Sequence, residues 1–119
     1  MLQEFVDKLN DRYPDPGNCG IIALALISGS HYLQCKKIGI RHGWKADGIT
    51  CQGLMMALKD LEVKVEIVDG ERKRLKTWGR MSGMWIAKTK DHFSVIVDGK
   101  LINPVGCENH EVQMLLKIL

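Results

Sequence analysis

The sequence lacks the features that would point to a membrane or to nucleic acid. No apolar run approaches the ~20 residues that a bilayer-spanning helix needs. An acid stands near the start, where a signal peptide would carry its basic region. The net charge of +3 is small, and the most basic run, residues 71–76, is short and opens with an acid. We therefore expect no membrane partner and no nucleic-acid partner.

Cysteine pairs typical of zinc or redox motifs are also missing. The four cysteines (Cys19, Cys35, Cys51 and Cys107) include no Cys-x-x-Cys pair. We expect no metal site and no cofactor. Because no secretion signal is visible, we expect reduced thiols in a cytoplasmic protein. At 119 residues the chain can bury one core, which predicts a single domain over residues 1–119.

Apolar periodicity predicts helices first and strands afterwards. The expected helices cover residues 2–12, 19–28, 31–41, 50–60, 72–80 and 108–119, and the expected strands cover residues 63–68, 84–88, 93–97 and 100–103. Asn18 is the expected N-cap of the second helix and Ser30 that of the third. The expected apolar members of the third helix are Tyr32, Leu33, Ile38 and Ile40. Helices followed by strands indicate the α+β class.

One hairpin has a predictable register. Asp98-Gly99 is a strong signal for a two-residue type I′ turn. Such a turn places Ile96 opposite Leu101 and Ser94 opposite Asn103. Because side chains alternate along a strand, His92 then shares one face with Ser94 and lies diagonally across from Asn103.

The stretch Asp15–Gly20 carries the candidate nucleophile. A turn-forming cluster leads directly into an apolar helical run, and Cys19 lies at the junction. A thiol there faces unpaired backbone N–H groups and the positive end of the helix dipole. Both favour the thiolate, which is the nucleophilic form of cysteine.

His92 is the candidate base, because it begins an otherwise apolar strand. His31, His42 and His110 are interpreted as solvated surface histidines. The amide oxygen of Asn103 is the candidate group that orients the His92 ring. Taken alone, Asn103-Pro104 is better interpreted as an ordinary strand-ending turn, and the catalytic interpretation rests on Cys19, His92 and Asn103 together.

Three motifs resemble the papain-like cysteine peptidase superfamily. They are Cys19-Gly20-x-x-Ala23-Leu24-Ala25, the run from His92 to Gly99, and Asn103-Pro104. The layout is most similar to bacteriocin-processing (double-glycine leader) peptidase domains and to small phage proteins. The resemblance implies a papain-like fold, in which N-terminal helices carrying the cysteine pack on a small antiparallel sheet carrying the histidine and asparagine. It also implies a peptide or protein substrate.

Tyr13 departs from the family pattern. Leader peptidases usually carry a glutamine six residues before the nucleophile as an oxyanion donor, and Tyr13 holds that position here. The Tyr13 phenol or the Asn18 amide could donate instead, beside the backbone N–H of Cys19. Two alternatives therefore stay open. One is a slow or inactive papain-fold binding or regulatory protein, of the kind that phages encode, and the other is an acyltransferase or transglutaminase-like use of the same residues.

Overall fold

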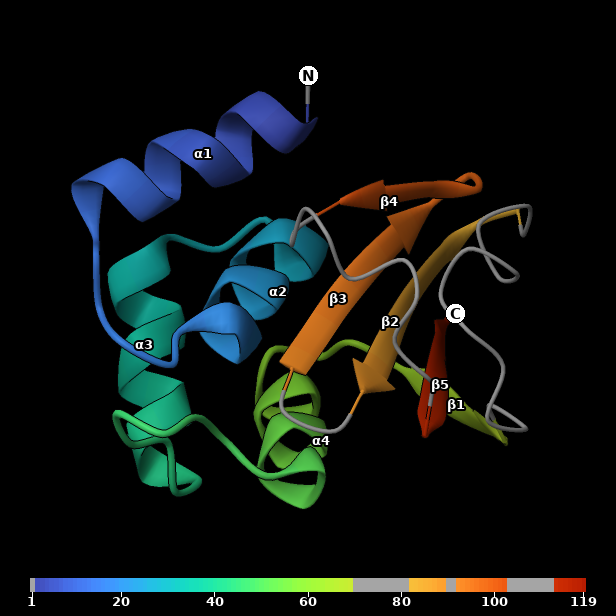
Figure 1. The fold of residues 1–119 in the computed structure, drawn as a ribbon. Coiled ribbons are helices and arrows are strands. Elements are labelled where there is room, and N and C mark those ends of the chain that lie inside the picture. Colours follow the sequence, from blue (N-terminus) through green and yellow to red (C-terminus); the bar gives the residue numbers. More distant parts are fainter. Residues whose placement is uncertain (1, 70–81, 90–91, 103–112) are drawn as a thin grey trace. The chain divides into compact units, whose positions relative to one another are not determined.

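The structure, a computed structural model, describes residues 2–69, 82–89, 92–102 and 113–119. The chain divides into two compact units, residues 1–64 and 65–119. The first is helical and the second is a sheet (Figure 1). This arrangement confirms the predicted α+β class. The expectation of one papain-like domain over residues 1–119 stays a prediction.

The helical unit contains the first four predicted helices. They are α1 (Leu2–Arg12), α2 (Cys19–Ser28), α3 (Tyr32–Arg41) and α4 (Cys51–Asp60). The centre of the unit is α2, which is apolar on all sides and packs against the other three helices (Figure 1). Its residues from Gly20 to Ala25 are all buried. A helix without a polar face has to be surrounded by other elements.

Two details of α3 differ from the expectation. Its N-cap is His31 rather than Ser30, and the His31 Nδ1 accepts a hydrogen bond from the Leu33 N–H at 3.2 Å. Leu33, expected among the apolar members of this helix, is 51% exposed. The buried face instead follows the helical spacing of Tyr32, Cys35 and Ile38.

The second unit is an antiparallel sheet. Its described strands are β1 (Val65–Asp69), β2 (Met84–Thr89), β3 (His92–Val97), β4 (Lys100–Ile102) and β5 (Met114–Ile118), in the order β1-β5-β2-β3-β4. The strand expected from residue 63 thus begins at residue 65. The helix expected over residues 72–80 lies outside the described residues.

The predicted β3–β4 hairpin is confirmed. Ile96 lies opposite Leu101 and Val97 opposite Lys100. Both turn residues have positive φ, 49° at Asp98 and 79° at Gly99, as a type I′ turn requires. The backbone N–H of Gly83 donates to the Asp98 carboxylate at 3.0 Å, which ties the turn to the start of β2.

The helix expected over residues 108–119 is wrong for the part that the structure describes. Residues 114–118 form β5, which pairs with β1 on one side and β2 on the other. Leu115 and Leu116 are adjacent and are 0% and 1% exposed. Because neighbouring strand residues point to opposite faces, this part of the sheet is covered on both faces.

No helix in the described ranges is long and apolar enough to cross a membrane.

Candidate active site

Cys19 is the first residue of α2 and is a half-buried thiol. The helix begins where the Asn18 carbonyl accepts from the Ile22 N–H at 2.9 Å. The first turn contains no acidic residue that would offset the positive end of the helix dipole. Cys19 thus lies where a helix presents N–H groups that have no acceptor within the helix.

Asn18 occupies the N-cap position, as predicted, but its side chain makes no capping hydrogen bond. Its Nδ2 donates instead to the Tyr13 carbonyl at 3.0 Å and to the Tyr32 hydroxyl at 3.2 Å. Since the Tyr13 carbonyl can only accept, the atom facing it has to be the amide nitrogen. Both hydrogens of that nitrogen are therefore used.

Tyr32 joins Asn18 to the loop before it. Its hydroxyl donates to the Asp15 carboxylate at 2.8 Å, and Lys36 Nζ lies 3.2 Å from the other carboxylate oxygen. The hydrogen bond from Tyr32 lowers the pKa of Asp15, with Lys36 acting in the same direction and burial opposing both. Burial raises the pKa of Tyr32 to about 12. At neutral pH the pair is therefore a neutral phenol donating to a carboxylate.

The Tyr13 side chain is fixed by contacts of its ring with two neighbouring rings. The ring stacks on Tyr32 with centroids 4.3 Å apart and planes 9° from parallel. The His31 ring meets it edge-on at 6.3 Å. The residue at the predicted oxyanion position thus also braces the loop that leads to Cys19.

The segment after α3 supports the same loop. The Trp44 indole N–H donates to the Gly17 carbonyl at 2.8 Å. Gly17 has a φ of 68°, and a Cβ on it would clash with the Ala46 carbonyl. The nucleophile loop is therefore fixed from two sides, by the start of α3 and by the segment that follows α3.

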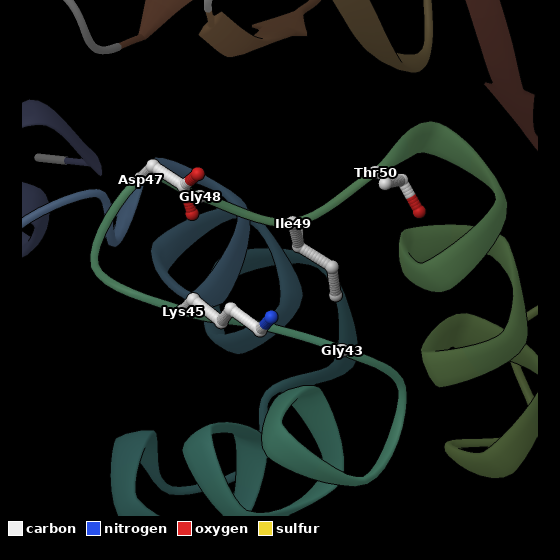
Figure 2. Close-up of a pocket in the computed structure, with 6 residues that line it drawn as sticks. All are labelled: Gly43, Lys45, Asp47, Gly48, Ile49 and Thr50. Carbon is white, nitrogen blue, oxygen red and sulfur yellow. The ribbon is translucent and has the colours of Figure 1, made fainter.

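This segment also lines an open pocket of about 300 Å³. It is lined by Gly43, Lys45, Asp47, Gly48, Ile49 and Thr50. Figure 2 shows the Ile49 side chain pointing from one arm of the loop toward the other, where Lys45 lies. Backbone hydrogen bonds between Lys45 and Gly48 close the far end of the loop.

His92 is the first residue of β3, as predicted, and is half-buried. It lies opposite Thr89, whose hydroxyl donates to the His92 carbonyl at 3.4 Å. Its strand face also carries Ser94 and Ile96, and on that face Ile96 packs with Trp85, Ala87 and Leu115. A paired, largely apolar sheet face therefore carries the candidate base.

The structure describes four of the five candidate site residues, and these four belong to two different units. Tyr13, Asn18 and Cys19 lie together in the helical unit, whereas His92 belongs to the sheet unit. Asn103 lies outside the described residues, as do Cys107 and His110. No cluster of potential metal ligands occurs among the residues that the structure describes.

His31 and His42 have structural partners. His31 caps α3, and His42 Nε2 lies 2.7 Å from the Asp60 carboxylate. Tyr32, in contrast, is predicted from the sequence only as an apolar member of its helix. The signal that could have revealed its role is its hydroxyl, because a buried tyrosine usually needs a polar partner.

A comparison with protein families identifies the class to which the chain belongs. The Peptidase C39 family model matches residues 14–101, which include Cys19 and His92 and end two residues before Asn103. The chain is thus a papain-like protein of the α+β class. It belongs to the Peptidase C39 family, which includes the bacteriocin-processing leader peptidases. No curated protein and no solved structure is significantly similar to it.

Proposed function

We propose that the protein is a cysteine peptidase that cleaves a peptide or isopeptide bond with Cys19, His92 and Asn103. The observation that carries the proposal is the position of Cys19. It is the first residue of a buried helix and lies inside the family match that also spans His92. Membership in a peptidase family makes a peptide or protein the expected substrate.

Each residue has a defined step in the proposed reaction. His92 takes the proton of the Cys19 thiol, and the sulfur attacks the carbonyl carbon of the substrate. The tetrahedral intermediate collapses to a thioester as His92 returns the proton to the leaving amine. Water, deprotonated by His92, then releases the acid and restores the thiol. Asn103 accepts from the imidazole and fixes its orientation.

The oxyanion donors follow from the helix start. The backbone N–H of Cys19 is the first proposed donor. Asn18 already donates both of its amide hydrogens, so it could serve only by giving up one of those bonds. Tyr13 is the second proposed donor, through its phenol. The loss of one such donor typically slows an enzyme by roughly 10²–10³.

A slow or inactive binding or regulatory protein of the same fold, of the kind that phages encode, is the alternative. The observation that favours it is Tyr13, because leader peptidases usually carry a glutamine at that position. Its ring is also packed face to face against Tyr32, which fixes the direction of the phenol oxygen.

Thiol reactivity tests the proposal without a known substrate. The full-length protein is treated with iodoacetamide across a pH series, and each cysteine is followed by peptide mass spectrometry. We expect Cys19 to react far faster than the other three cysteines and to do so well below pH ~8.5, the ordinary pKa of a free thiol. Cys35 serves as an internal reference, since it is fully buried and burial raises its pKa.

His92→Ala should remove the advantage of Cys19, and His42→Ala is the matched control that should keep it. Equal rates for Cys19 and the half-buried Cys51 in the unaltered protein would contradict the proposal. Reactive Cys19 with no cleavage of peptide or branched isopeptide libraries would favour the binding protein. Transfer of the acyl group to an added amine would indicate the transferase.

A further inference from the structure

The three helices with a defined N-cap differ in how their caps are used. At α3 and α4 the capping residues His31 and Thr50 are extended, with ψ of 142° and 159°, and their side chains accept from a helix N–H. At α2 the capping residue Asn18 has φ −93° and ψ 10°, and its side chain accepts from none. Only the helix that carries Cys19 lacks a side-chain cap among these three.

The missing side-chain cap is unexpected for an asparagine. Asparagine is among the strongest N-cap residues, because its amide oxygen accepts from the N–H of the second or third helical residue. In α2 those residues are Gly20 and Ile21. The Asn18 amide instead points its nitrogen at the Tyr13 carbonyl and the Tyr32 hydroxyl. A specific pair of acceptors therefore holds it away from the helix.

Tyr32 is placed and bonded in a way that can fix the Asn18 amide. It is 2% exposed, and it is the first residue of α3. Its oxygen accepts from Asn18 while its hydrogen goes to Asp15, which Lys36 in turn fixes. Because both donor and acceptor functions of the buried hydroxyl are satisfied, the ring has one preferred orientation.

We infer that Tyr32 is a positioning residue for Cys19. It holds the Asn18 amide out of the cap of α2, so that the amide oxygen does not accept from the N–H groups of Gly20 and Ile21, which can then serve the thiolate and the oxyanion. The inference deepens the proposed function and rests on it for the use of those N–H groups. The position of the Asn18 amide is independent of the proposed function, because it follows from the hydrogen bonds to Tyr13 and Tyr32.

Tyr32→Phe is the direct test, because it removes the hydroxyl and keeps the ring that stacks on Tyr13. We expect Cys19 to react with iodoacetamide roughly fivefold to tenfold more slowly at pH 7, the effect of losing one hydrogen bond. Backbone hydrogen exchange at Gly20 and Ile21 should become slower, because the released Asn18 can then cap them. Ser28→Ala is the control. It removes a hydroxyl at the other end of α2, which donates to Leu24, accepts from Ser30 and contacts Cys35, and it should change neither reading.

Asn18→Asp tests the same mechanism without altering the buried ring. A carboxylate cannot donate to the Tyr13 carbonyl, but it can cap the helix and repel a thiolate. We expect Cys19 to react at least about tenfold more slowly, since one pKa unit changes the thiolate fraction tenfold. The double variant with Tyr32→Phe should be no slower than Asn18→Asp alone, because both changes act through one group.

Three outcomes would overturn the inference. The first is an unchanged Cys19 labelling rate in a folded Tyr32→Phe protein. The second is a double variant whose Cys19 rate falls by the product of the two single-variant effects. The third is unchanged hydrogen exchange at Gly20 and Ile21 in Tyr32→Phe. Should Tyr32→Phe not fold, Asn18→Asp decides alone, and a Cys19 rate equal to that of the unaltered protein overturns the inference. Failure of the proposed function would give a different result from failure of this inference. Cys19 would then be no faster than Cys51 in the unaltered protein, while slowed exchange in Tyr32→Phe would still report the held amide.

Discussion

Gly17→Ala should destabilise the protein and slow Cys19, and a second glycine supplies a matched control. Gly17 has a φ of 68° and Gly29, the C-cap of α2, has a φ of 72°. An added Cβ at Gly17 would clash with the Ala46 carbonyl, whereas at Gly29 it would meet nothing within 4 Å. The two substitutions therefore share a backbone penalty and differ in packing.

The magnitudes follow from these surroundings. A left-handed alanine costs about 1–2 kcal/mol, which is the whole expected effect of Gly29→Ala. Gly17→Ala adds an overpacking cost of about 1–3 kcal/mol, for a total of about 2–5 kcal/mol. The effect of replacing glycine on the unfolded chain is common to both variants and cancels in the comparison.

Urea unfolding followed by circular dichroism measures the two stabilities, and iodoacetamide labelling measures the site. We expect Gly17→Ala to have the lower midpoint and a slower Cys19, because the loop has to move away from Ala46 and the bond from Trp44 is strained. Gly29→Ala should label at the rate of the unaltered protein. Equal midpoints for the two variants would refute the packing argument. A lower midpoint with an unchanged Cys19 rate would show that the loop contributes to stability alone.

Two further predictions concern titration and the sheet. Burial raises the pKa of Tyr32 to about 12, so the stability that it contributes is complete below its unfolded pKa of about 10 and is lost as the pH rises through the folded value. Tyr32→Phe should flatten the loss of stability between those two values in an alkaline unfolding titration, and an unchanged curve would contradict the assignment. Leu115→Ala should cost about 2–5 kcal/mol in urea unfolding, because it opens a cavity in a covered sheet face. Lys117→Ala, two residues further along and exposed, should cost little, and equal losses would contradict the burial of Leu115.

The features that the sequence predicted well are encoded locally. A two-residue turn fixes the register of β3 and β4, so the positions opposite Ile96 and Val97 followed from Asp98-Gly99 alone. The start of α2 followed from a turn cluster leading into an apolar run. In both cases neighbouring residues carry the information, and no distant partner is needed to interpret it.

The errors occur where partners are distant in the chain. Residues 114–118 consist mainly of methionine, leucine and lysine, which favour a helix, yet they pair with β1 and β2. Burial on both faces outweighs a weak local preference. Periodicity likewise counted Tyr32 as apolar, because it registers the ring and takes no account of the hydroxyl.

The residue at position 13 bears on how well the proposed reaction would be catalysed. A glutamine amide on a flexible side chain can turn to meet an oxyanion as it forms, whereas the Tyr13 ring is stacked on Tyr32. Its phenol can therefore donate only in the direction that the stack already sets. The electrostatic stabilisation of the proposed reaction then depends mainly on the backbone N–H groups at the start of α2, and those groups stay available only while Asn18 is held from capping them. Loop packing around Cys19 is thus expected to change the reaction rate even where the proposed catalytic residues themselves are unaltered.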